Sequence, residues 1–146
     1  MTRPTQRIIA AIPGLVFFVF GCAKILDPAG FAVDIRNYRI LPWTWGVLLA
    51  LYLPWLEIVC GAALLLRRAY RGALSIIALL LAIFIAAYGS TRLRGLDINC
   101  GCFGHGVHRG YWAVLIGDAL LLAIVIWLIR EDARPLSPVL RGEPGK

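Results

Sequence analysis

Four long apolar runs constrain this chain more than any other feature of its sequence. They cover residues 8–26, 45–66, 72–90 and 111–129. Each is long enough to cross about 30 Å of hydrocarbon at the helical rise of about 1.5 Å per residue. Lipid offers the backbone no hydrogen-bond partners, so apolar runs without period-two alternation must satisfy their backbone groups as helices. The sequence therefore predicts an all-α integral membrane protein built as a four-transmembrane-helix bundle.

The composition agrees with a lipid environment. Hydrophobic residues make up 60% of the chain and charged residues only 16%, and a water-soluble core of this size cannot bury so much apolar surface. We expect one membrane domain over residues 1–134, followed by a polar cytoplasmic tail over 135–146. The net charge of +7 does not indicate nucleic-acid binding, because the arginines lie at the ends of the apolar runs. The oligomeric state is left open.

Lysine and arginine near the ends of the runs predict which side of the membrane each loop faces, since positive charge gathers on the cytoplasmic side. One side carries nine: Arg3, Arg7, Arg67, Arg68, Arg71, Arg130, Arg134, Arg141 and Lys146. The other carries six: Lys24, Arg36, Arg39, Arg92, Arg94 and Arg109. We therefore expect both termini in the cytoplasm and the loops 27–44 and 91–110 on the extracytoplasmic side, where disulfides persist.

A second interpretation of the N-terminal run is a secretory signal. Arg3 and Arg7 precede the run, and Val19-Phe20-Gly21-Cys22 resembles a lipoprotein cleavage box. Phenylalanine fits such a box poorly and the run is long for a signal, so we expect the first span to be retained.

A thiol pair lies in the second extracytoplasmic loop, in the sequence DINCGCFGHG over residues 97–106. A disulfide between Cys100 and Cys102 requires a sharp fold at Gly101, which glycine permits because it has no Cβ. Such a small ring is strained, and strained exposed disulfides are the oxidising, exchangeable kind. The spacing favours a redox-active pair, and two free loop thiols are the simpler alternative.

Two histidines follow the thiol pair. His105 and His108, with Cys100 and Cys102, offer two nitrogens and two sulfurs, a donor set suited to zinc or copper. The C-x-C spacing is tighter than that of most metal-binding cysteine pairs, so a metal is not favoured. The imidazoles have the simpler role of stabilising a nearby thiolate, or of being solvated loop residues.

The other two cysteines differ in depth. Cys22 lies four residues before the end of its run, about 6 Å inside the face that carries the thiol pair. It is a candidate relay thiol as well as a packing residue. Cys60 lies about 22 Å from that face, so we expect it to pack as a small apolar residue.

Charged residues also occur inside the apolar runs. Glu57 and Asp118 are expensive in hydrocarbon, so each is expected to face the bundle interior and either protonate or pair. Lys24 either snorkels to the interface or reaches inward to one of them. The functional interpretation makes the two carboxyl groups proton carriers for a two-electron, two-proton step at a quinone. The alternative is a buried hydrogen bond that fixes helix register.

Several short stretches together resemble a known family. In chain order they are Gly21–Pro28 (GCAKILDP), Phe31, Tyr38–Pro42 (YRILP), Leu53–Glu57 (LPWLE) with Gly61, and Cys100–Gly104 (CGCFG). The pattern resembles the MauE family of methylamine-utilisation proteins, which is grouped with the DoxX-like membrane proteins. The likeness runs from about Gly14 to Asp118, and CGCFG is its most specific part.

The resemblance implies a four-helix bacterial inner-membrane protein that works with a periplasmic thioredoxin-like partner. In the methylamine system such a pair is associated with forming the disulfides of the dehydrogenase small subunit. The layout is also similar to the disulfide-generating DsbB and vitamin K epoxide reductase proteins, with four helices, an exposed thiol pair and a quinone within reach. This sequence departs from them in having C-x-C instead of C-x-x-C and no obvious second exposed pair.

Residues and resemblance together lead us to expect a membrane thiol-disulfide oxidoreductase. Cys100 or Cys102 would exchange with an extracytoplasmic thioredoxin-like protein, with Cys22 as relay. Electrons would pass to or from a quinone between the helices, and Glu57 or Asp118 would handle the protons. The direction of electron flow is left open, although a strained Cys100–Cys102 disulfide favours oxidising the partner. Two alternatives stay open. One is a non-enzymatic DoxX-like subunit or scaffold in which the thiol pair staples its loop, and the other is a metal-handling protein that uses the cysteines and histidines of that loop.

Overall fold

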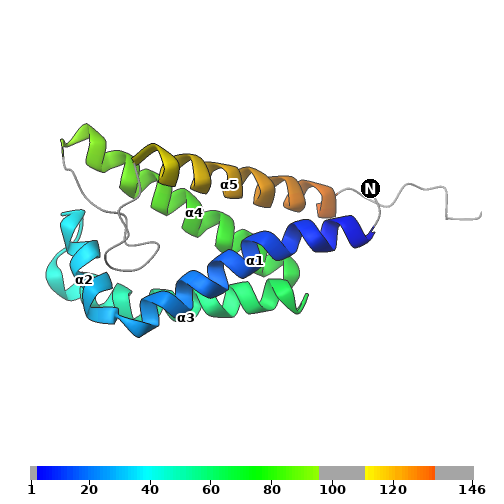
Figure 1. The fold of residues 1–146 in the computed structure, drawn as a ribbon, viewed down its shortest axis with the longest axis horizontal. Helices are drawn as coiled ribbons and strands as arrows, with labels where there is room; N and C mark the ends of the chain where they lie inside the picture. Colours follow the sequence, from blue (N-terminus) through cyan, green and yellow to red (C-terminus); the bar gives the residue numbers. More distant parts are fainter. Residues whose placement is uncertain (1–2, 96–110, 134–146) are drawn as a thin grey trace, which may run out of the picture.

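The computed structural model describes residues 3–95 and 111–133. In these residues it contains five helices and no strand: α1 (Arg3–Leu26), α2 (Pro28–Asn37), α3 (Trp43–Leu65), α4 (Tyr70–Leu93) and α5 (Tyr111–Ala133) (Figure 1). Four segments are long and apolar enough to cross a membrane: Ile8–Leu26, Trp43–Leu65, Tyr70–Leu93 and Trp112–Ala133. The predicted all-α architecture and its four spans are confirmed, each boundary to within a few residues.

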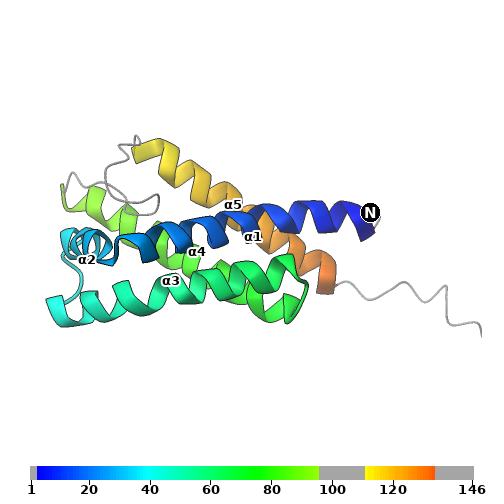
Figure 2. The same ribbon diagram turned by 60° about the horizontal axis from the view of Figure 1, so that its bottom comes forward.

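The long helices run alternately up and down, so each end of the bundle gathers a fixed set of helix ends. One end, called here the terminal end, holds the start of α1, the α3–α4 turn and the end of α5 (Figure 1). The opposite end, called the α2 end, holds α2, the start of α3, the end of α4 and the start of α5. α1 lies beside α3 and α4 beside α5, as the turned view also shows (Figure 2).

The contact between α1 and α3 depends on glycines. A Cβ at Gly61 would lie 2.7 Å from the Gly14 carbonyl oxygen and 2.7 Å from the Phe18 nitrogen. A Cβ at Gly21 would lie 2.8 Å from the Pro54 carbonyl oxygen. At such distances the two backbones touch, which small residues allow in membrane helix pairs. Gly14, Gly21 and Gly61 therefore let α1 and α3 approach closely.

α1 stops partway along α3. Gly21 lies against Pro54, which is eleven residues after the start of α3 and therefore about 16 Å along it. The first turns of α3 extend past the end of α1 and pack against α2 instead, where Phe31, Ala32 and Ala50 form a small buried cluster. α2 thus fills the space that the short reach of α1 leaves beside α3.

No helix was predicted from the sequence in residues 27–44, where the structure has α2. Asp27 caps this helix by accepting a hydrogen bond from the Gly30 backbone N–H at 2.9 Å, and Pro28 occupies the first helical turn. Aspartate at the N-cap followed by proline at the first helical position is a common start signal. That start signal was present in the sequence, but the helix that follows it has only ten residues. It is much shorter than the four membrane spans, so its apolar pattern was not recognised.

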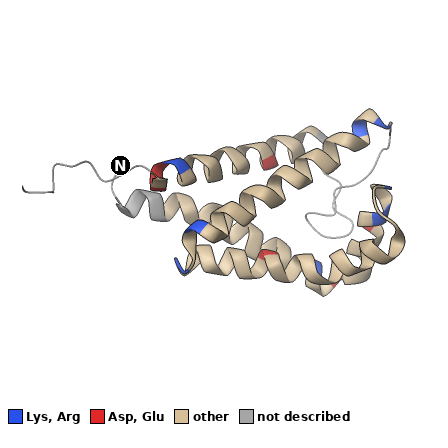
Figure 3. Cartoon of the chain, turned by 180° about the vertical axis from the view of Figure 1, so that it is seen from behind, with Lys and Arg blue, Asp and Glu red and all other residues tan. Residues whose placement is uncertain are grey.

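The main apolar core lies among α1, α3, α4 and α5. It includes Phe17, Cys60, Leu64, Leu74, Ile77, Leu81, Val125 and Leu128. Cys60 is only 3% exposed in this cluster, which confirms its predicted packing role. The outward faces of the helices remain apolar and exposed, as at Tyr52, Leu79 and Leu120, and these are the surfaces that lipid covers. Figure 3 shows basic residues mainly at the bundle ends.

Candidate functional site

A buried ion pair joins α1 to α3 inside the bundle. Lys24 Nζ lies 2.6 Å from Glu57 Oε1 and 2.8 Å from Glu57 Oε2. Both side chains are 2% exposed. The expectation that Glu57 faces the interior and pairs is confirmed, and of the two alternatives for Lys24 the structure has the inward one. Charge-assisted hydrogen bonds of this length are among the stronger polar contacts in proteins.

The helix offset explains why Lys24 reaches inward. In an α-helix the Cα–Cβ bond tilts towards the N-terminus, so a side chain near the end of α1 points back towards the middle of the bundle. Glu57 lies on the α3 face that also carries Cys60 and Gly61, and all three are buried. Because α1 and α3 run antiparallel and Gly21 touches Pro54, Lys24 and Glu57 lie about one turn to either side of that contact, and the long lysine side chain spans the gap between them.

Two aromatic rings flank the ammonium group. Lys24 Nζ lies 5.0 Å from the centroid of the Phe31 ring and 5.1 Å from that of Phe84. A cation near an aromatic face is stabilised by about 0.5–2 kcal/mol, with the higher values at desolvated sites. The rings therefore compensate part of the hydration that the ammonium loses on burial.

A small cavity lies beside the ion pair and brings in a third charged residue. Its volume is about 20 Å³, and Lys24, Glu57, Phe84 and Asp118 line it together with apolar side chains. Asp118 is half-buried. A cavity of this size holds about one water molecule when its walls are polar. It is far below the roughly 300–1,000 Å³ of pockets that hold organic ligands.

All five helices contribute to this junction. α1 supplies Lys24, α2 Phe31, α3 Glu57, α4 Phe84 and α5 Asp118. The result is one ammonium and two carboxyl groups around one small cavity. Such a set can hold and pass protons, and ionisable residues inside membranes usually mark function.

The cysteines of the described residues are both free thiols. Cys22 is half-buried in α1 and Cys60 is buried in α3. Because its neighbour Gly21 touches Pro54, Cys22 lies about 16 Å along α3, at nearly the depth of the ion pair. The depth of about 6 Å expected from the sequence was the distance from Cys22 to the end of the first apolar run. It did not include the part of α3 that extends past the end of α1.

The remaining predicted site residues lie outside the described residues. These are Cys100, Cys102, His105 and His108. In the part of the chain that the structure describes, no group of three or more His, Cys, Asp or Glu side chains is placed to hold a metal ion.

The two aromatic rings beside the ion pair and the hydrogen bonds of Arg94 were not predicted from the sequence. Phe31 drew notice only as part of the family resemblance, and nothing in the sequence marked Phe84. Arg94, at the end of α4, donates hydrogen bonds to the carbonyl oxygens of Tyr38 and Arg39. It thereby ties the end of α4 to the segment that follows α2, directly before the loop that holds the thiol pair. The only signal was its place next to that loop.

Comparison with known proteins gives one consistent match. The family model for methylamine utilisation protein MauE matches residues 3–130. A protein of that name from Paracoccus denitrificans is 30% identical over 114 residues, which cover 77% of this chain and 61% of the relative. Its counterpart from Paracoccus versutus is 31% identical over 113 residues, or 76% and 61%. The protein of that name from Methylorubrum extorquens is 31% identical over 109 residues, or 71% and 56%.

This chain spans about three fifths of the length of the curated relatives that it matches. No solved structure matches it significantly.

Proposed function

Because this chain belongs to the MauE family of methylamine utilisation proteins, we propose that it is a membrane accessory protein whose task is thiol-disulfide exchange. The family names suggest methylamine utilisation as the setting. The exchange itself is our own step beyond the family, and it depends on how the thiols and charges of this chain are arranged.

The observation that carries the proposal is the placement of Cys22. This free thiol lies two residues before Lys24 on α1, at about the depth of the ion pair with Glu57. A purely structural bundle needs neither a thiol nor three ionisable groups at one depth, since a buried ion pair adds little stability over apolar packing. A thiol at the depth of proton-holding groups suits redox chemistry, in which electrons and protons move together.

The proposed reaction begins with the Cys100–Cys102 disulfide. A thiolate of an extracytoplasmic thioredoxin-like protein attacks one sulfur of this bond, which breaks and leaves a mixed disulfide and one free thiolate. The second thiol of the partner then attacks the mixed disulfide. The partner gains a disulfide and loses two electrons and two protons, and Cys100 and Cys102 gain the same number as two thiols.

Cys22 is proposed as the relay that takes the exchange inward, with Glu57 and Asp118 holding the protons that the thiols release. A quinone is the oxidant that we propose for the two electrons and two protons that the reduced thiols give up in this direction of flow. The 20 Å³ cavity beside Lys24 does not fit a quinone ring, so we assign no step to that cofactor.

The burial of Lys24 supports the proposed orientation. Charges count towards membrane sidedness when they lie in loops near the span ends, and Lys24 is only 3% exposed inside the bundle. Removing it from the extracytoplasmic set leaves nine basic residues against five. The larger excess favours cytoplasmic termini and an extracytoplasmic thiol-pair loop in the inner membrane.

Mixed-disulfide trapping tests the proposal. A variant of the thioredoxin-like partner that keeps only its attacking cysteine lacks the thiol that resolves the mixed disulfide, so its complex with the wild-type chain should accumulate and disappear on reduction. Cys100→Ser combined with Cys102→Ser removes the disulfide that is attacked and should abolish this complex. Cys60→Ala is the matched control, because that buried thiol lies outside the proposed route and should leave the complex as in the wild type. Absence of a mixed disulfide with the wild-type chain would favour the scaffold alternative.

A further inference from the structure

A larger cavity lies at the terminal end and shares no residue with the ion-pair site. Its volume is about 550 Å³, and its walls include Arg67, Tyr70, Arg71, Gly72, Leu128 and Asp132. The cavity lies where the α3–α4 turn meets the last turn of α5, at the ends of three membrane spans. Nothing in the proposed thiol exchange uses it.

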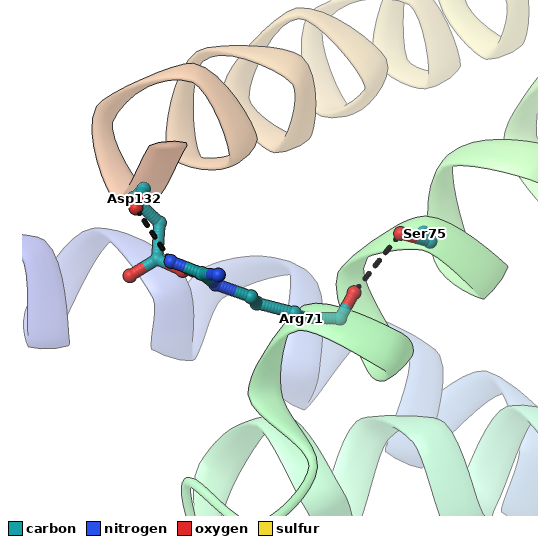
Figure 4. Close-up of polar contacts among 3 residues, drawn as sticks. All are labelled: Arg71, Ser75 and Asp132. Carbon is teal, nitrogen blue, oxygen red and sulfur yellow. Dashed lines mark hydrogen bonds and ion pairs between the residues drawn. The ribbon is translucent and has the colours of Figure 1, made fainter. Parts of the chain in front are cut away.

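Charge in this cavity is unbalanced. Arg71 Nε donates to Asp132 Oδ2 at 2.5 Å and Arg71 Nη2 donates to the Asp132 carbonyl oxygen at 2.9 Å, reaching from α4 to α5 (Figure 4). Asp132 is thereby neutralised. The guanidinium group of Arg67 lies 5.3 Å from the Tyr70 ring and makes no ion pair with a described residue. Among the described residues, one positive charge is therefore left over at the cavity wall.

The start of α4 adds to the positive potential. Its N-cap residue, Ala69, has a φ of 50° and gives no side-chain cap, so the amides of the first turn lack intrahelical partners. Tyr70, Arg71 and Gly72 belong to that turn and line the cavity. A Cβ at Gly72 would meet nothing within 4 Å, so the space over the turn is open. Uncapped helix starts attract anions.

Apolar side chains continue from the charged wall. Leu66, next to Arg67, is 73% exposed, and Leu65 is 41% exposed. In a bilayer these side chains face acyl chains, while the cavity at the span ends lies at the level of the phosphates. Anionic lipid headgroups bind to basic pockets between helices at this level.

We propose that this cavity binds the headgroup of an anionic phospholipid, with Arg67 as the principal phosphate ligand. The phosphate would lie between the Arg67 guanidinium and the first turn of α4, and the acyl chains would run over Leu65 and Leu66. An unmatched cation, open space over uncapped amides and an adjoining apolar surface fit an amphiphile with a negative head.

Lipid titration followed by native mass spectrometry tests this inference on the detergent-purified protein. Phosphatidylglycerol should bind at least about fivefold more tightly than phosphatidylcholine, and Arg67→Gln should remove about that factor, as expected for one basic residue at a headgroup. Arg68→Gln is the matched control, since it removes the same charge one residue away, outside the cavity lining. It should change binding less than twofold.

Two outcomes would overturn the proposal. Equal losses from Arg67→Gln and Arg68→Gln would mean that phosphatidylglycerol is held by diffuse surface charge. Displacement of the lipid by an equal concentration of inorganic phosphate would mean that the cavity is a free-anion site. Thermal unfolding of both variants, expected to match the wild type because both side chains are exposed, separates loss of binding from loss of fold.

Discussion

Lys24 and Glu57 form an ion pair that links α1 to α3 with contacts of 2.6 and 2.8 Å while both side chains remain 2% exposed. Desolvating two charges costs several kcal/mol each, and their attraction returns about that amount only when the geometry is good. The pair therefore adds little to the free energy of unfolding. Replacing only one of the two residues, however, should be costly, because the other charge then stays buried without a partner.

Breaking one side of this pair should destabilise the protein more than removing both sides. Lys24→Met leaves the Glu57 carboxylate buried without its partner, and we expect a loss of about 3–5 kcal/mol in the free energy of unfolding. Lys24→Met combined with Glu57→Leu should recover most of that loss. Denaturant titration of the protein in bicelles measures both. Equal losses from the single and double variants would show that the two charges are not coupled.

The α1–α3 contact should be sensitive to a single methyl group. Gly61→Ala puts a Cβ 2.7 Å from backbone atoms of α1, so the helices must separate, and we expect a cost of about 1–3 kcal/mol in unfolding free energy. Gly89→Ala, where a Cβ meets nothing within 4 Å, is the control. Alanine there should be neutral or stabilising by up to about 1 kcal/mol. Similar effects at both positions would contradict the close backbone contact.

The two described thiols should differ in reactivity. Cys22 is half-buried and Cys60 is only 3% exposed in the apolar core. With the loop cysteines replaced by serine, we expect a membrane-permeant methanethiosulfonate to modify Cys22 at least about tenfold faster, because access limits thiol chemistry at buried sites. Single-cysteine variants read by mass shift give the two rates. Faster modification of Cys60 would argue against Cys22 as a relay.

The spans could be predicted from sequence because lipid imposes strict rules on length and polarity. A run such as 72–90 has few alternatives to a membrane helix. For the same reason Glu57, an expensive charge in such a run, was correctly expected to face inward, and of the two expected outcomes, protonation or pairing, the structure has the ion pair.

The partner of Lys24 could not be predicted, because it depends on where α1 ends relative to α3. That offset arises from the contact of Gly21 with Pro54 and from the packing of α2 beside Ala50. Phe31 and Phe84 approach the ammonium group only after these helices meet. Such long-range contacts leave no local pattern in the sequence.

The redox state of the thioredoxin-like partner in cells tests the central claim most directly. Alkylation of its thiols after acid quenching separates the oxidised and reduced forms by gel shift. With the wild-type chain the partner should be largely oxidised. With Cys102→Ser it should become largely reduced, while Cys60→Ala should leave it as in the wild type. An unchanged partner in the Cys102→Ser strain would contradict the assignment of this chain as a thiol-disulfide oxidoreductase.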